Sequence, residues 1–301
     1  MSRLATLALI ALVAPGCLPA DDRPEPGSVL VNVGRSEAAH EGFVTDDGWQ
    51  ISFDRFVTAI GDMGLDGDDC SDYSRSGYER LYDFTVADTA KASLHYGLGQ
   101  CTIVFSMRAP SPRAILMAGV TQADRELMGM EASGPFHGEK DETIGLMVVG
   151  RAERASETKQ FSWLIRRWQR IGACHNAAGE DLSAIALSAG DAFLRELEVR
   201  PQELFRLTPS LVAAIEFGRM AEADADGDGT ITQEELAKVS VPADEIAADL
   251  ADEVPDWKPD RIAELIGDAT LATLVFDILP LRILAFAGAG ECQAGDRSGM
   301  F

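Results

Sequence analysis

Apolar residues recur at every second position in the first part of the chain, which is the spacing of a half-buried β-strand. The pattern is clear over residues 29–33, 49–53 and 101–107. It returns over residues 144–151 and 159–165, and the turn residues between these two segments predict a hairpin. Short strands at such intervals are typical of two antiparallel sheets packed face to face. This part of the chain is therefore expected to form an antiparallel β-sandwich.

The period of the apolar residues changes from two to that of an α-helix near Asp191. We therefore expect residues 28–190 to form the β-sandwich domain and residues 191–301 to form a C-terminal α-helical unit. The predicted fold class is α+β. Prolines separate some of the candidate helices. These helices cover residues 192–199, 209–223, 234–239, 243–253, 260–266 and 269–286.

Residues 224–235, which we call the acidic loop, place oxygen-bearing side chains at alternate positions. Calcium is a hard ion that takes six to eight oxygen ligands, and a 12-residue loop of this kind can deliver them around one centre. Gly229 stands at the sixth position, where the chain must turn sharply around the ion. The expected calcium ligands are Asp224, Asp226, Asp228, Thr230 through its carbonyl, Thr232 through water, and Glu235.

The acidic loop resembles the calcium loop of the EF-hand family over all twelve residues, including the apolar Ile231 at the eighth position. The resemblance implies a helix on each side of the loop and Ca²⁺ as the cofactor. Thr232 and Glu235 have the spacing of a capping box, so the exiting helix should begin inside the loop. Because the sequence has no second loop of this kind, we expect Ile231 to lack a β-bridge partner. The affinity should then be modest, on the order of 10⁻⁴–10⁻³ M.

The formal net charge of −23 argues against nucleic acid as a partner, because binding to phosphates needs a basic surface. The negative charge concentrates around the acidic loop, since 13 acidic and two basic residues lie between Glu216 and Asp256. Like charges at this density repel one another, so a divalent cation should stabilise this part of the chain.

The apolar run over residues 271–290 invites comparison with a membrane span. It is interrupted by Asp277, Pro280 and Arg282. Two charges near the centre of a bilayer would cost about 2.5–3.5 kcal/mol each on insertion scales. We therefore expect a buried helix that packs under the acidic loop.

The N-terminus is expected to be a targeting segment. Residues 1–16 combine an early positive charge with an apolar run that is too short to span a bilayer, as a signal peptide does. The Ala-Pro-Gly-Cys segment that ends at Cys17 resembles the lipobox of bacterial lipoproteins. The resemblance implies a lipidated Cys17 as the membrane anchor and a tether over residues 17–27. Leu18 implies sorting to the outer membrane, whereas cleavage after Ala20 would give a secreted protein.

Four cysteines remain after Cys17, an even number that predicts two disulfides in an oxidising compartment. Three pairings are compatible with the sequence. We favour Cys70–Cys101, because both residues lie in the N-terminal half of the chain. The second bond would then be Cys174–Cys292, which would tie the end of that half to the chain terminus.

The whole chain resembles uncharacterised bacterial secreted lipoproteins in its lipobox, its Asp-Gly-Trp turn at residues 47–49 and its Gly-x-Gly-x-Cys close at residues 288–292. This resemblance implies no known enzymatic activity. The predicted function is that of an exported calcium-binding lipoprotein, in which calcium is structural or sets the contact with an envelope protein. The alternative is a carbohydrate- or surface-binding module with calcium as its scaffold. An enzyme with a site gathered from scattered residues is a third hypothesis.

Three other groups of residues have two interpretations each. The basic residues of segment 166–170 protect a strand edge or contact an anionic lipid or saccharide. The acidic segment 66–72 is a solvated turn or a weak calcium site. Trp49, Trp163 and Trp168 belong to the core or form a face on which sugars stack.

Overall fold

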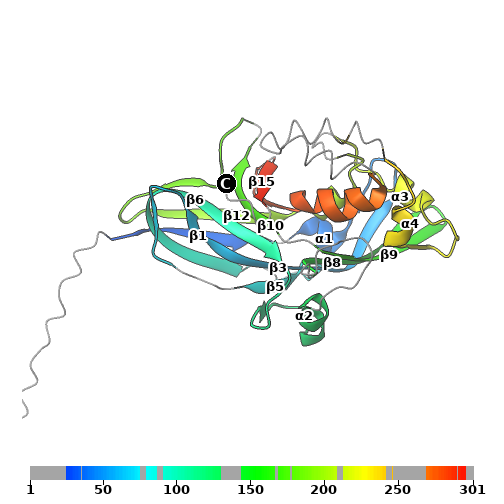
Figure 1. The fold of residues 1–301 in the computed structure, drawn as a ribbon, viewed down its shortest axis with the longest axis horizontal. Coiled ribbons are helices and arrows are strands. Elements are labelled where there is room, and N and C mark those ends of the chain that lie inside the picture. Colours follow the sequence, from blue (N-terminus) through cyan, green and yellow to red (C-terminus); the bar gives the residue numbers. More distant parts are fainter. Residues whose placement is uncertain are drawn as a thin grey trace, which may run out of the picture.

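The computed structural model describes residues 25–295 apart from 35, 75–78, 87–90, 130–143, 167–168, 177, 209–212, 242–245, 247–268 and 290. Within these ranges the protein is mostly β, and its 15 strands belong to one mixed sheet that curls along its length (Figure 1). The predicted signal peptide and Cys17 lie outside the described residues, so their assignments stay predictions.

Two long neighbouring strands, β3 (Gln50–Asp66) and β6 (Lys91–Arg108), form the centre of the sheet. Their register shifts between Gly61 and Gly64, where Asp62 has a φ of 46°. A bulge of this kind bends a strand and increases its twist, which helps the sheet to curl. The other strands that pair along β6 are β1 (Gly27–Val33), β4 (Cys70–Asp72), β10 (Gln169–His175) and β11 (Ala184–Leu187).

The predicted hairpin is confirmed: β8 (Leu146–Arg154) and β9 (Glu157–Ile165) pair in antiparallel fashion next to β3. Arg154 pairs with Glu157, so the turn consists of two residues, and the first of them, Ala155, has a φ of 53°. A positive φ at this point is typical of tight hairpin turns. Alternate side chains of β9 are buried, as the period of two predicts, and this strand carries the acidic loop at its free edge.

Strands from the C-terminal part of the chain belong to the same sheet, so the predicted sandwich followed by a helical unit is wrong. β12 (Ala192–Val199), expected to be a helix, pairs in parallel with β1. β14 (Leu284–Phe286) pairs with β12, and β15 (Glu291–Gly295) pairs with β10. Five of the eight residues of β12 are apolar, and their positions (192–194, 197 and 199) fit a helix as well as a strand. Pairing with β1 decides the conformation, because it buries Leu197 and Val199 on one face.

The helices that flank the acidic loop are short. α3 (Gly218–Glu222) precedes the loop and α4 (Gln233–Leu236) follows it, each with little more than one turn. No C-terminal helical EF-hand unit is present in the described residues, which corrects the prediction. The helices expected over 243–253 and 260–266 fall outside the described residues, apart from Ile246.

A helical segment over residues 271–282 packs against the sheet, as expected for a buried helix, and is drawn in orange in Figure 1. It contains a π-helix, η2 (Thr273–Ile278), and a 3₁₀ turn, η3 (Leu279–Arg282). The ring centroids of Phe276 and Trp163 are 6.1 Å apart, which places the helix against β9. None of the described helices is long and apolar enough to cross a membrane.

Aromatic side chains from several elements meet in the core of the protein. Trp49 and Trp163 are 0% and 1% exposed. The ring centroid of Trp163 lies 4.7 Å from that of Phe161, and Trp49 contacts Phe217 at 5.2 Å. The suggestion that Trp49 and Trp163 form a sugar-stacking face is therefore wrong, and Trp168 lies outside the described residues.

Both disulfides have the favoured pairing, which confirms that prediction. Cys70–Cys101 joins β4 to β6 with a Cα–Cα distance of 4.9 Å. Cys174–Cys292 joins β10 to β15 with a Cα–Cα distance of 3.9 Å. The second bond closes a segment of 118 residues that includes the acidic loop.

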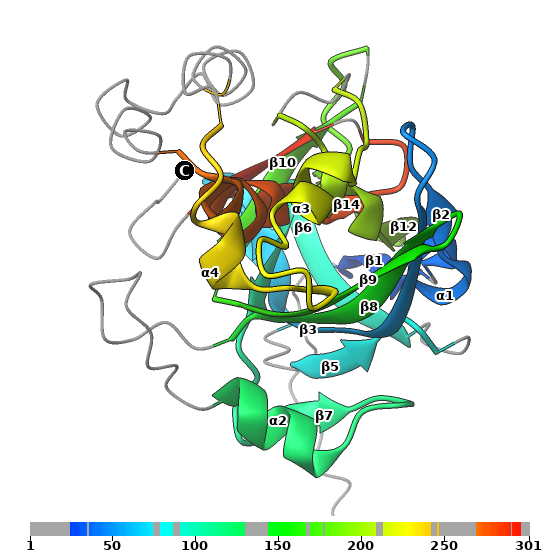
Figure 2. The ribbon, with the colours of Figure 1, turned by 90° about the vertical axis from the view of Figure 1, so that its right-hand side faces the viewer.

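The strand order explains where the acidic loop sits. The main path of the sheet is β13-β9-β8-β3-β6-β1-β12-β14, and β13 (Thr230–Ile231) is part of the acidic loop. The loop therefore lies at one end of the sheet, with α3 and α4 beside it (Figure 2). The remaining elements are α1 (Glu37–Glu41), β2 (Phe43–Val44), β5 (Arg80–Asp83), β7 (Ile115–Leu116), α2 (Gln122–Gly129) and η1 (Pro201–Phe205).

Candidate metal centre

The carboxylates of the acidic loop fold the loop back on itself. Asp224 accepts hydrogen bonds from the N–H groups of Gly227 (2.9 Å) and Gly229 (3.0 Å). Asp226 accepts from the N–H of Asp228, with the two atoms 3.1 Å apart. Gly229 has a φ of 84°, a conformation that glycine adopts without strain, so the sharp turn expected at the sixth position is confirmed.

Within the described ranges, one group of three acidic side chains could hold a metal ion: Asp224, Asp226 and Glu235. One ligand atom from each lies within 4.8 Å of the others. Calcium takes its oxygens at 2.3–2.6 Å, so two ligands of one ion are separated by at most about 4.6–5.2 Å. The three carboxylates therefore fit a calcium ion, which would draw its remaining ligands from the rest of the loop.

The other expected ligands lie in the same loop and have additional contacts. The carboxylate of Asp228 accepts a hydrogen bond from the N–H of Thr230 at 2.6 Å. Thr232 forms a capping box with Glu235: its hydroxyl accepts from the N–H of Glu235 at 3.2 Å, and Glu235 accepts from the N–H of Thr232 at 2.9 Å. The predicted capping box is confirmed. It orients the twelfth residue of the loop, which is 7% exposed.

The acidic loop is bonded to the free edge of β9. Thr230 and Ile231 pair in parallel with Gln160 and Phe161. The N–H of Gln160 donates to the carbonyl of Gly229 at 2.7 Å. The expectation that Ile231 has no β-bridge partner is therefore wrong, because the sheet supplies the strand that a second loop would otherwise provide.

The side chain of Trp163 strengthens this attachment from inside the core. Its indole Nε1–H donates a hydrogen bond to the carbonyl of Ile231 at 3.1 Å, and both residues are 1% exposed. A buried indole N–H needs an acceptor, and here that acceptor belongs to the acidic loop. The position of the loop is thus determined by the hydrophobic core as well as by the strand edge.

The helix that enters the loop is tied to another turn of the sheet. Asp47 accepts hydrogen bonds from the N–H groups of Phe217 (3.2 Å) and Gly218 (2.8 Å) at the start of α3. A side chain at Gly218 would collide with this carboxylate, because a Cβ atom there would lie 2.8 Å from it. Asp46 also accepts from the N–H of Ile215 at 2.9 Å. The acidic loop is therefore fixed to the sheet both before and within its own sequence.

Lys159 of β9 adds a positive charge to the site. Its Nζ lies 2.7 Å from Oδ2 of Asp224 and 3.4 Å from Oε1 of Glu157. The hydrogen bond from Lys159 lowers the pKa of Asp224 and is the largest cause of that shift. The same hydrogen bond raises the pKa of Lys159. Both groups are therefore charged at neutral pH.

Sequence reasoning named candidate ligands in the loop but did not predict the contacts of Lys159, Trp163 and Asp47. Lys159 and Trp163 lie 65 and 68 positions from the loop residues that they contact, and Asp47 lies 171 positions from Gly218 of α3; no spacing pattern links them to the loop. Ser156 and Lys159 have a Ser-x-x-Lys spacing that occurs in some acyl-transferring enzymes. Because the ammonium of Lys159 is engaged by Asp224, this pair does not favour an enzyme.

The acidic segment 66–72 is explained by contacts within the protein. Asp66 forms an ion pair with Arg170 at 2.7 Å, which accounts for part of the basic segment as well. Asp72 accepts hydrogen bonds from the N–H groups of Leu65 (3.2 Å) and Ser74 (2.8 Å). These contacts favour a structural turn over a second calcium site.

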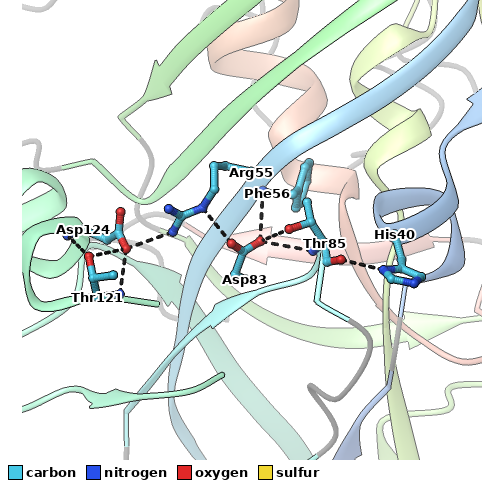
Figure 3. A network of polar contacts seen from close by, with 7 residues as sticks. All are labelled: His40, Arg55, Phe56, Asp83, Thr85, Thr121 and Asp124. Carbon is cyan, nitrogen blue, oxygen red and sulfur yellow. Dashed lines mark hydrogen bonds and ion pairs between the residues drawn. The ribbon is translucent and has the colours of Figure 1, made fainter. Parts of the chain in front are cut away.

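A further polar network joins β3, β5 and α2 around Arg55 (Figure 3). Nε of Arg55 lies 2.7 Å from Asp83, and Nη2 lies 2.9 Å from Asp124. Asp83 also accepts hydrogen bonds from the N–H and hydroxyl of Thr85, whose carbonyl lies 2.6 Å from Nδ1 of His40. Partial burial would raise the pKa of Asp124, but its hydrogen bonds outweigh this effect and lower the pKa. The network anchors α2 to the sheet, which is a structural role.

Comparisons of the chain with protein families, with curated proteins and with solved structures found no match. The function proposed below is therefore argued from the residues and their geometry.

Proposed function

We propose that the acidic loop binds Ca²⁺ and that the bound ion has a structural role. The ion would be held by Asp224, Asp226 and Glu235, with Asp228, the carbonyl of Thr230 and a water at Thr232 completing the ligands. The observation that carries the proposal is the convergence of three loop carboxylates within 4.8 Å of one another, in a loop bonded to the edge of β9. Calcium would neutralise this charge and hold the loop on the strand.

A structural role is favoured over a switch because the loop is attached to fixed elements. A calcium switch needs helices that can change their relative orientation. Here α3 is held by Asp47, and Ile231 is held by β9 and Trp163 in the core. Movement of the loop would break buried hydrogen bonds, so calcium would stabilise one arrangement rather than choose between two.

We further propose that the protein is exported and anchored to the outer membrane by a lipid on Cys17. The two disulfides support an oxidising compartment, where such bonds persist. Although Ile231 has a β-bridge partner, we keep the proposed affinity in the extracellular range of about 10⁻⁴–10⁻³ M, because the ammonium of Lys159 on Asp224 opposes a second cation. At roughly millimolar calcium such a site is about half to nine-tenths filled. An envelope protein or a glycan is the proposed partner class.

The test is a calorimetric titration of the purified, disulfide-bonded protein with Ca²⁺ and with Mg²⁺. Wild type should bind one Ca²⁺ on the order of 10⁻⁴–10⁻³ M. Glu235→Gln should weaken binding at least tenfold, because the closing carboxylate is lost. Glutamine still serves in a capping box, so α4 should be retained.

Glu234→Gln is the matched control, since it makes the same chemical change at the neighbouring, exposed position of α4. This variant should bind calcium as wild type does, within about twofold. A wild-type protein that binds no calcium in the millimolar range would refute the proposed function. Equal weakening by both substitutions would show that binding reflects general negative charge and not the ligand set.

A further inference from the structure

Lys159 is placed unusually for a surface lysine. It belongs to β9, beside the residue that pairs with Thr230, so the strand register directs it to the acidic loop. Its side chain is 13% exposed, and the side chain of Asp224 that it contacts at 2.7 Å is 0% exposed. The exposed pair between Arg151 and Glu153, with side chains 47% and 52% exposed, is a contrasting case on the neighbouring strand.

The ammonium of Lys159 and a calcium ion at the loop would share a ligand. Nζ lies 2.7 Å from Oδ2 of Asp224, and calcium would lie 2.3–2.6 Å from an oxygen of the same carboxylate. The two cations would then be separated by about 5–7 Å, depending on which oxygen the calcium takes. Even at the dielectric constant of water, the repulsion between a single and a double charge at this distance corresponds to about a tenfold change in affinity.

We infer that Lys159 is an intramolecular counter-ion of the acidic loop, which keeps the loop on β9 in the absence of calcium and lowers its affinity for the ion. This inference rests on the proposed calcium function and adds the residue that regulates it. Asp224, the first ligand of the loop, also accepts hydrogen bonds from Gly227 and Gly229. The lysine therefore stabilises a folded loop whose carboxylates would otherwise repel one another.

Two opposite effects follow from removing this charge. Without the lysine, the loop carboxylates repel one another more strongly, so the calcium-free protein should be less stable. The same loss of positive charge should strengthen calcium binding. A lysine that acts only as a structural salt bridge would change the stability without increasing the affinity.

The experiment compares calcium titration and thermal unfolding in EDTA for wild type, Lys159→Met and Lys159→Arg. The methionine variant should bind Ca²⁺ about tenfold more tightly and unfold at a lower temperature in EDTA. The arginine variant keeps the charge and should stay within about threefold of wild type in affinity. Lys159→Gln is a second neutral variant, to be used if the methionine variant does not fold.

Arg151→Met is the matched control, because it removes one positive charge from β8 at the residue that pairs with Gln160. Its ion pairs are with Asp54 and Glu153 and do not involve the loop, so the affinity should change by no more than about twofold. The inference is overturned if neutral variants at Lys159 bind calcium no more tightly than wild type, or if Arg151→Met gives the same gain.

The outcomes separate this inference from the proposed function. Calcium binding by wild type with no gain in the neutral variants would leave the proposed function intact and overturn only the role of Lys159. Calcium binding by the neutral variants alone would support that role and show that the lysine suppresses the site. No binding by any variant would overturn both proposals.

Discussion

Removal of calcium should lower the thermal midpoint of the protein. An ion that binds only the folded chain adds RT ln(1 + [Ca²⁺]/Kd) to the free energy of unfolding. For a Kd of 10⁻⁴–10⁻³ M and calcium at about 10 mM, this contribution is about 1.4–2.7 kcal/mol. In a chain of this size, 1 kcal/mol shifts the midpoint by about 2–4 °C, so we expect a difference of about 3–10 °C between calcium and EDTA.

The structure also predicts the form of this change. The acidic loop is joined to the sheet through Asp47, Trp163 and the bridge between Ile231 and β9. Trp163 and Ile231 belong to the same core as the long strands. Calcium loss should therefore move one cooperative transition to lower temperature and should not create a separate early transition for the loop.

Differential scanning calorimetry measures this effect in three solutions: about 10 mM CaCl₂, about 10 mM MgCl₂ and EDTA. Each salt concentration is about tenfold above the weakest expected Kd. Wild type and Glu234→Gln should show the full shift in calcium, and Glu235→Gln should show little of it. Magnesium demands near-octahedral coordination and keeps several waters, so its effect should be the smaller one. Equal midpoints of wild type in calcium and EDTA would refute the structural role, as would an undiminished shift in Glu235→Gln.

Two further predictions concern the contacts that surround the loop. Trp163→Phe keeps an aromatic ring but leaves the buried carbonyl of Ile231 without this donor, so we expect a loss of at least about 1–3 kcal/mol of stability and weaker calcium binding. An unchanged calcium titration would show that Trp163 does not affect the loop. Replacement of Cys174 and Cys292 by serine opens a segment of 118 residues, and the chain-entropy relation gives a loss of stability of about 4.9 kcal/mol. The same replacement of Cys70 and Cys101, which span 31 residues, should cost about 3.7 kcal/mol. Urea unfolding of the two double variants checks this order, and the reverse order would argue against the chain-entropy explanation.

Features that depend on neighbouring residues could be predicted from the sequence. The hairpin of β8 and β9 follows from alternating apolar residues on each side of a short turn. The turns of the acidic loop and its capping box arise from side chains that bond to backbone groups two to five residues away. The disulfide pairing is an exception over 31 and 118 positions: it was favoured because it groups the cysteines by halves of the chain, and the structure confirms it.

Features that depend on distant residues could not be predicted. The apolar residues of β12 fit the period of a helix as well as that of a strand, and its conformation is decided by β1, more than 150 positions earlier. The same limit applies to the site. Lys159 contacts Asp224 across 65 positions, and Trp163 contacts Ile231 across 68. A motif identifies the ligands of a metal, but the residues that fix and tune them come from the tertiary fold.

The position of the acidic loop at the end of the sheet would give a bound calcium ion a specific task. An edge strand with unpaired N–H and C=O groups invites pairing with other chains, and proteins cover or charge such edges. On its outer side β9 pairs with the two residues of β13, and Lys159 places a charge on the same strand. Calcium bound to the carboxylates beside β13 would therefore hold in place the segment that covers this edge. On this argument the ion stabilises the fold and also limits association of the protein through β9.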